Sequence, residues 1–276
     1  CSRTADHWPR TTMSLPEPRP LTEFHVDSLR VQVFEDRAHL ARAAAIGVAR
    51  AMGARLATHD RVHIVFAAAP SQDEFLAGLV ALQGIDWSRA VGFHMDEYLG
   101  LSPEHPASFR RYLHEHLFRF VELPEDRLRL IPGERSDRPL QTCLDYEDAL
   151  MSEPADIVCA GIGENGHLAF NDPPVADFLD PVLVKVVRLD HACRQQQLHD
   201  GCFDRLEDVP THAYTLTVPA LLAAPLVSVV VPGPRKADAV LNTLRGPISE
   251  SCPASALRKH PGAVLFLDRE SAGLVL

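Results

Sequence analysis

A histidine in a glycine-rich turn is the first residue of this chain that could do acid–base chemistry. His167 lies in GIGENGHLAFNDP (161–173), directly after the apolar run DIVCAG, and Asn165 and Asp172 flank it. Glycines let a backbone approach a ligand closely, and an imidazole exchanges protons near neutral pH. The sequence therefore predicts a catalytic histidine here. The alternative is a tight structural turn in which the histidine bonds to backbone.

Two adjacent carboxylates form the second candidate. Asp96 and Glu97 follow the apolar run AVGFHM (90–95). Because side chains alternate along a strand, the two point to opposite sides, and Asp96 shares a face with His94. At most one of them faces a given ligand site, where it could act as a general base. Solvated turn residues are the competing interpretation, and His94 fits a site wall and the core equally well.

Candidates for anion binding follow other apolar runs. Lys236 lies three residues after Gly233 at an expected helix start, where free backbone N–H groups favour a phosphate. Ser71 follows HIVFAAA and can donate a hydrogen bond, and Gly163 and Gly166 leave their backbone open to a ligand. An ordinary helix start with a solvated lysine is the alternative for Lys236.

The elements that would position these residues alternate along the chain. Apolar runs predict buried strands, helical spacing predicts helices, and SQDE (71–74) predicts a capping box that opens one of them. We expect strands over 63–69, 90–95, 127–130, 156–163, 182–190 (an edge strand), 226–233 and 263–268, and helices over 36–57, 72–83, 108–118, 140–151 and 235–246.

This alternation predicts an α/β fold in which helices cover both faces of a mostly parallel sheet. Ligands bind such sheets at the carboxyl ends of the strands, near a switch in strand order, which is where the candidate residues lie. The expected organisation is a flexible N-terminal tail over 1–22 and a single three-layer domain over 23–276.

Composition limits the partners. The chain has 276 residues and a formal net charge of -10, from 27 lysines and arginines against 37 aspartates and glutamates. This charge argues against nucleic acid and an anionic membrane surface as partners, and no apolar run approaches the roughly 20 residues of a membrane-spanning helix. An anionic ligand would require the few cations to gather at its site.

The cysteines and the N-terminal segment indicate the compartment. The six cysteines contain no CxxC pair, which favours free thiols in a reducing cytosol, a cytoplasmic location and no metal site. Residues 1–22 are rich in Pro, Arg, Ser and Thr and lack the apolar stretch of a secretory signal. Met13 is a candidate natural start.

Several segments, in this order, resemble the glucosamine-6-phosphate deaminase (isomerase) family, which is similar to 6-phosphogluconolactonases. They are FHMDEYLGL (93–101), HPASFRRYL (105–113), GIGENGHLAFNDP (161–173), the stretch 194–217 and GPRKADAV (233–240). The resemblance implies a Rossmann-like fold and an enzyme that converts an amino-sugar phosphate to a ketose phosphate and ammonia. It implies a small phosphosugar as partner and no cofactor or metal, and it leaves open whether the chain forms a homo-oligomer.

The resemblance also implies roles for individual residues. Asp96 matches the general base that moves a proton between C1 and C2 of the opened sugar, and His167 matches the group that assists ring opening. Asn165 and Asp172 match the positions that support the histidine, and Lys236 matches a phosphate-binding lysine.

Three departures from the family pattern concern charge and phosphate binding. The family has an acidic residue in place of Asn165 and a glutamate in place of Asp172. Its Gly-Gly phosphate loop is replaced by AAAPSQDE (67–74), where Asp73 and Glu74 would repel a phosphate.

The third departure lies after Arg194, where His199 occupies the position of an expected phosphate-contacting arginine. Arg194 and His199 are therefore the remaining phosphate-binding candidates. Together the departures predict an altered substrate preference. Two other functions stay open, namely a phosphogluconolactonase-like hydrolase in which His167 activates water, and a catalytically weak sugar-phosphate sensor.

Overall fold

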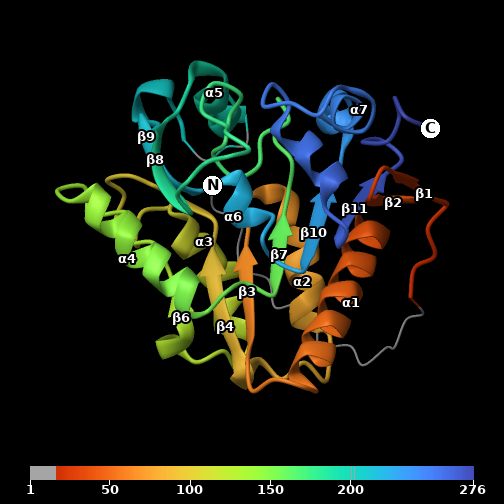
Figure 1. Cartoon of the computed structure of the whole chain (residues 1–276), viewed down its shortest axis with the longest axis horizontal. Coiled ribbons are helices and arrows are strands. Elements are labelled where there is room, and N and C mark those ends of the chain that lie inside the picture. The colour runs from red at the N-terminus through yellow and green to blue at the C-terminus, as the bar shows by residue number, and fades with distance from the viewer. Residues whose placement is uncertain (1–16, 200, 202) are drawn as a thin grey trace.

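The structure, a computed structural model, describes residues 17–199, 201 and 203–276, without the side chains of residues 192, 196 and 199. Within these residues, eight strands form one sheet in the order β1-β2-β11-β10-β7-β3-β4-β6, shown in Figure 1. They are β1 (Thr22–Val26), β2 (Leu29–Phe34), β3 (Val62–Phe66), β4 (Ala90–His94), β6 (Leu128–Arg129), β7 (Ile157–Ala160), β10 (Leu226–Val231) and β11 (Ala263–Asp268). Only β1 runs antiparallel to its neighbour, so the predicted mostly parallel sheet is confirmed.

Helices cover both faces of this sheet. The helices of the described residues are α1 (Arg37–Leu56), α2 (Asp73–Ala81), α3 (Phe109–His116), α4 (Pro139–Ser152), α5 (His191–His199), α6 (Val218–Leu221) and α7 (Ala237–Arg245). Alternate residues of β3 enter two different apolar cores. Val65 packs in a core with residues of α4 and α7, whereas Ile64 and Phe66 pack in one with residues of α1, α2 and α3. Successive side chains of a strand face opposite sides, so the two cores define the predicted three layers.

The strand order reverses between β3 and β7. From β3 the chain steps outward to β4 and β6, and it then returns to place β7 on the other side of β3, followed by β10 and β11. In open parallel sheets this switch point separates the loops at the carboxyl ends and leaves room for a ligand between them. The segments after β3 and β7 carry Ser71 and His167, so the topology brings two candidates to the same edge.

A second, antiparallel sheet lies beside this edge. It consists of β5 (Asp96–Tyr98), β9 (His212–Leu216) and β8 (Val184–Arg188), in that order. The predicted edge strand over 182–190 is confirmed as β8, at the edge of this small sheet. This pairing could not be predicted from the sequence, because β5 is only three residues long and its partner β9 lies more than a hundred residues later. This sheet holds Asp96 in a strand instead of a turn.

The predicted capping box over 71–74 is wrong. Ser71 lies within a 3-10 turn, Pro70–Gln72, and α2 begins at Asp73 without a side-chain cap. A capping serine needs an extended backbone, and here Ala69 has that conformation instead. By contrast, the helix predicted over 36–57 is confirmed as α1, and its N-cap Asp36 accepts a hydrogen bond from the amide of His39 at 2.9 Å.

The domain boundary predicted at residue 23 falls too late. Glu17 forms a two-fold hydrogen bond with Arg50 of α1, and the amide of Leu21 donates to Val33 of β2. Residues 17–22 are therefore packed on the domain rather than part of a flexible tail. Residues 1–16, to which the rest of that prediction refers, lie outside the described residues.

The structure shows the state of four cysteines and the character of the described helices. Cys143, Cys159, Cys193 and Cys252 are buried free thiols, whereas Cys1 and Cys202 lie outside the described residues. Across the part of the chain that is described, no helix has both the length and the apolar character needed to cross a membrane.

Candidate active site

The candidate residues gather at the carboxyl ends of four adjacent strands. Along the order β10-β7-β3-β4, these ends lead to Lys236, the glycine-rich loop with His167, Ser71 and Asp96, respectively. In Figure 1 the arrows of these four strands all point to the same upper edge of the sheet. The parallel arrangement thus collects residues that lie as much as 165 positions apart in the sequence.

His167 lies in a tight loop that is shaped by two glycines. A Cβ atom on Gly163 would lie 2.1 Å from Cε1 of the His167 ring, so only glycine leaves room for the imidazole. Gly166 has a φ of 86°, and a Cβ there would meet Sγ of Cys252 at 2.6 Å. Both glycines, proposed from sequence as ligand contacts, therefore have a packing reason of their own.

Asp172 supports the ring of His167. Its Oδ1 lies 3.0 Å from Nδ1 of His167 and accepts a hydrogen bond of 2.8 Å from Nδ2 of Asn165. The amide of His167 in turn donates to Oδ1 of Asn165 at 3.1 Å. A carboxylate beside Nδ1 favours the tautomer in which Nδ1 carries the proton and Nε2 can accept one.

The charge of Asp172 follows from its surroundings. Burial acts to raise the pKa of this carboxyl, but its contacts with His167, Asn165 and the thiol of Cys193 outweigh burial and hold the pKa below its ordinary value. Asp172 is thus an anion at neutral pH. The anion beside Nδ1 also orients the imidazole, which suits His167 to proton transfer.

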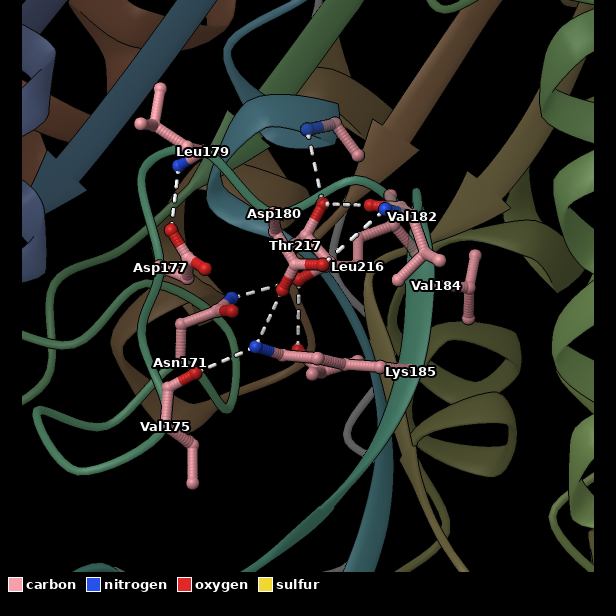
Figure 2. Close-up of polar contacts among 12 residues, drawn as sticks. Asn171, Val175, Asp177, Leu179, Asp180, Val182, Val184, Lys185, Leu216 and Thr217 are labelled. Carbon is pink, nitrogen blue, oxygen red and sulfur yellow. Dashed lines mark hydrogen bonds and ion pairs between the residues drawn. The ribbon is translucent and has the colours of Figure 1, made fainter.

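The loop after Asp172 is fixed to the small sheet, as Figure 2 shows. Nζ of Lys185, on β8, donates to the carbonyl of Val175 at 2.6 Å and to Oδ2 of Asp180 at 2.7 Å. Nδ2 of Asn171 donates to the carbonyl of Leu216 on β9 at 2.8 Å. These bonds anchor the backbone on both sides of Asp172, so the position of its carboxylate is set by the small sheet.

Asp96 has the opposite electrostatic environment. Asp96 is 8% exposed. Burial, and after it the charge of Glu97, raises the pKa of the Asp96 carboxyl well above its ordinary value. A carboxylate with a raised pKa is a stronger base, and it is suited to abstract and return a proton. As predicted from strand alternation, Glu97 points elsewhere, into the start of α3, where the Ser108 hydroxyl donates to it at 2.8 Å.

The segment that replaces the glycine phosphate loop is organised by Gln72. This fully buried side chain donates from Nε2 to Oγ of Ser71 at 3.3 Å and to the carbonyl of Val230 at 3.4 Å. It packs on Gly161, where a Cβ would come within 2.9 Å of Nε2. Because Oγ of Ser71 accepts from Gln72, its own hydroxyl proton can be donated to another acceptor.

The two acidic residues of this segment have partners elsewhere. Asp73 accepts a hydrogen bond from the Tyr112 hydroxyl of α3, and Glu74 pairs with Arg37 of α1 at 2.9 Å. The repulsion that the sequence predicts between these carboxylates and a phosphate is thereby reduced, since both carboxylates are directed toward neighbouring helices.

The basic candidates are distributed over two regions. Lys236 is the last residue of a 3-10 turn, Pro234–Lys236, and the N-cap of α7. It therefore lies at a helix start, as the sequence predicts. Nη1 of the neighbouring Arg235 lies 3.4 Å from Oε1 of Glu164. This ion pair joins the turn to the loop of His167. By contrast, Nη2 of Arg194 donates to the carbonyl oxygens of Leu206 and Val209 and thus braces the following loop.

Two further histidines, His199 and His94, are candidates from the sequence. His199 ends α5, but its side chain is not among those described. His94 is fully buried, its Nε2 accepts from the amide of Ile131 at 2.7 Å, and burial followed by the charge of Arg110 lowers its pKa to about 3. His94 is therefore a neutral core histidine.

Sequence reasoning missed Cys193 and Gln197 of α5. Cys193 contacts the carboxylate of Asp172, and Oε1 of Gln197 accepts from the hydroxyl of Tyr98 at 2.5 Å. The two residues are one helical turn apart, so one face of α5 reaches both the support of His167 and the strand of Asp96. Their spacing in CRQQQ (193–197) was visible, but it signals nothing until the partner strands are known.

Other parts of the molecule contribute less to this chemistry. Within the described residues, no group of three or more His, Cys, Asp or Glu side chains is arranged to hold a metal ion. A groove of about 740 Å³ lies between α1 and the strands β2, β10 and β11, and none of the candidate residues lines it.

Comparison with known proteins assigns the family. Residues 35–178 match the family model described as glucosamine-6-phosphate isomerases/6-phosphogluconolactonase. The chain belongs to this family. A protein of Listeria monocytogenes serotype 4a (strain HCC23) named glucosamine-6-phosphate deaminase is 34% identical over 218 residues, which cover 79% of this chain and 90% of that protein. A protein of the same name from Exiguobacterium sp. (strain ATCC BAA-1283 / AT1b) is 38% identical over 188 residues, covering 68% and 71% of the two chains.

Solved structures of the same family have the same fold. A monomeric glucosamine-6-phosphate deaminase superposes with a TM-score of 0.82 at 28% identity, covering 88% of this chain and 99% of that one. A 6-phosphogluconolactonase from Thermotoga maritima superposes with a TM-score of 0.70 at 20% identity, covering 87% and 99%. The second likeness concerns the fold alone. Both agree with the Rossmann-like architecture expected of this family.

Proposed function

We propose that this protein is a glucosamine-6-phosphate deaminase, which converts the amino-sugar phosphate and water to a ketose phosphate and ammonia. The observation that carries the proposal is the pair of opposed carboxylates. Asp172 is held ionised against His167, whereas Asp96 lies buried with a raised pKa. Two acids with divergent environments at one site are the arrangement expected when one group orients a histidine and the other exchanges a proton with carbon.

In the proposed mechanism, His167 begins the reaction by proton transfer during ring opening. Nε2 of the imidazole takes the proton of the C1 hydroxyl and delivers it to the ring oxygen as the C1–O5 bond breaks, so the aldehyde forms without net proton change. Asp172 stabilises the transient imidazolium through Nδ1. Asn165 adds no charge, but its amide keeps the carboxylate of Asp172 oriented.

Asp96 carries the second stage. Its carboxylate removes the proton from C2 of the open aldose and returns it to C1, while a proton passes from the amino group to the oxygen on C1. The amino aldehyde thereby becomes a C1 alcohol with an imine at C2. Water then adds to C2, and the C–N bond breaks to give the ketone and ammonia. A buried carboxylate with a raised pKa suits both proton removal and its return. In this proposal the reaction is the hydrolysis of a C–N bond.

Substrate phosphate is proposed to bind between Ser71 and Lys236. The hydroxyl of Ser71, oriented by Gln72, would donate to a phosphate oxygen, and Lys236 adds charge at the start of α7. Gly163 and Gly166 leave their loop backbone close to the sugar. A side-chain hydroxyl in place of the Gly-Gly backbone favours an altered substrate preference. Free buried thiols suit a cytoplasmic location, which we also propose.

The test is a coupled assay of purified protein with glucosamine 6-phosphate. Ammonia and ketose phosphate should appear in equal amounts, and Asp96→Asn should abolish both while leaving the circular dichroism spectrum unchanged. Met151→Ala, at an exposed position of α4, is the control and should keep full activity. A folded wild-type protein that releases no ammonia from any hexosamine phosphate refutes the proposal.

A lactonase function is the second candidate, because the pair of His167 and Asp172 could equally activate a water molecule. This reaction needs no base at C2. Hydrolysis of a phosphogluconolactone that survives Asp96→Asn but is lost in His167→Ala would favour it. Binding of sugar phosphates by calorimetry, with no turnover of either substrate, would instead favour a sensor on the same fold.

A further inference from the structure

Glu97 is a fully buried carboxylate on the strand that carries Asp96. Its Oε1 accepts from the amides of Tyr98 at 2.9 Å and Phe109 at 3.2 Å. Its Oε2 accepts from the hydroxyl of Ser108 at 2.8 Å and from the amide and Nε of Arg110, both at 3.2 Å. A single side chain thus joins β5 to the first turn of α3.

The set of partners identifies the charge state of Glu97. Four of the five bonds come from N–H groups, which can only donate, and the guanidinium of Arg110 forms an ion pair with the carboxylate. The start of a helix also stabilises an anion through its unpaired amides. Burial raises the pKa of Glu97, whereas Ser108 and Arg110 act in the opposite direction. Such a network is that of an ionised carboxylate whose charge is fixed in place.

We propose that Glu97 is the positioning residue of the candidate base Asp96, locking β5 against α3 and supplying a fixed negative charge one residue away. The inference rests on the proposed role of Asp96. Since neighbouring side chains of a strand point to opposite sides, the bonds that hold Glu97 on the α3 side also hold the carboxylate of Asp96 on the side of the candidate site.

Among the charged groups of the described residues, Glu97 is the one whose charge acts on the pKa of Asp96. Tyr146 of α4 and Cys193 of α5 both sense the charge of Asp96, but burial raises their pKa values, so both stay neutral. Burial is the larger cause of the raised pKa of Asp96, and Glu97 is the second.

On the far side of Glu97, the charge of Arg110 is shared. Its guanidinium also contacts Glu134 at 2.7 Å and lowers the pKa of His94, which is neutral. Arg110 therefore divides its charge between two carboxylates, and part of the negative charge of Glu97 remains to act on Asp96.

The experiment compares pH profiles of Glu97→Gln and Ser108→Ala. Glu97→Gln should move the acidic limb of kcat/KM down by on the order of one pH unit, because the base loses a nearby negative charge. It should also lower kcat by about ten-fold, because a base of lower pKa abstracts a proton less readily. Ser108→Ala removes a bond to Glu97 but no charge, so it should lower the melting temperature and leave the limb in place.

A second readout does not depend on turnover. The carboxyl carbon of Asp96, assigned by NMR through its loss in Asp96→Asn, should titrate at lower pH in Glu97→Gln. If that variant does not fold, Glu97→Gln combined with Arg110→Met removes both charges and should still give a downward shift, smaller because the positive charge of Arg110 is lost as well. A folded variant with an unchanged limb and an unchanged titration overturns the inference. Wild-type protein that releases no ammonia would instead refute the proposed function, while the titration still tests Glu97.

Discussion

The ring of His167 lies directly on the Cα of Gly163, where a Cβ atom would come within 2.1 Å of the imidazole. The amide of Gly163 also donates to the carbonyl of His167 at 3.0 Å, so the loop closes on itself under the ring. A methyl group at this position could only be accommodated if the imidazole turned away from Asp172. The position of the catalytic candidate therefore depends on the absence of a side chain four residues earlier.

We expect Gly163→Ala to lower kcat by about 100-fold, because a displaced imidazole no longer transfers its proton in line. Ammonia release measures the effect. Gly53→Ala is the matched control, since nothing lies within 4 Å of a Cβ at that helical position. It should keep activity and gain roughly 0.5–1 kcal/mol in free energy of unfolding, as alanine favours a helix over glycine. Full activity in Gly163→Ala would contradict the role of His167.

Asp96→Asn should trade activity for stability. The pKa of Asp96 is raised in the folded protein, so its stabilising contribution is present below the unfolded pKa and is lost as pH rises through the folded pKa. The asparagine carries no charge at any pH. The variant should therefore melt at a higher temperature than wild type at pH 8, with a smaller difference at pH 4. Calorimetry at both values checks this, and a lower melting temperature at pH 8 would show that Asp96 is favourably solvated.

Asp172 should give the opposite pH dependence. Its pKa is lowered on folding, so its contribution is present above the unfolded pKa and disappears as pH falls through the folded pKa. Asp172→Asn should lose stability at pH 7 and converge on wild type in strong acid. It should also lower kcat by about 100-fold, because the imidazolium of His167 loses its anion. Denaturant titrations across pH, with ammonia assays at pH 7, measure both effects.

Asn165→Asp would recreate the acidic residue of the family pattern, yet we expect it to impair this protein. Nδ2 of Asn165 donates to Asp172 at 2.8 Å, so an aspartate would place two carboxylate oxygens in contact. They would have to share a proton, which raises one pKa strongly. Activity at pH 7 should fall and recover in part at lower pH. A gain in activity at pH 7 would mean that the loop rearranges to separate the carboxylates.

Lys236 and Arg194 should differ in what they affect. Lys236→Ala should raise KM for the phosphosugar by roughly 10–100-fold with a smaller change in kcat, since it removes a charge from the proposed phosphate site. Arg194→Ala should mainly lower thermal stability, because Nη2 of Arg194 holds the carbonyl oxygens of Leu206 and Val209. Steady-state kinetics and melting curves separate the two. A rise in KM without loss of stability in Arg194→Ala would assign Arg194 to the phosphate.

The sequence by itself determined the layered α/β fold and which residues stand at the strand ends. Buried strands and amphipathic helices are local patterns, and parallel strands deliver their carboxyl ends to one edge. Asp96, His167 and Lys236 could be selected on that basis. Strand alternation also separated Asp96 from Glu97 before any contact was known.

Tertiary structure alone decided the environments of these residues. The opposed pKa shifts of Asp96 and Asp172 come from burial and from partners on other elements, including Cys193 of α5. The sequence predicts that Asp73 and Glu74 repel a phosphate, but in the structure these carboxylates contact Tyr112 and Arg37, respectively. A net charge is a sum over the chain, whereas electrostatic energies depend on distance and burial, so only the folded arrangement determines which charges a substrate would meet.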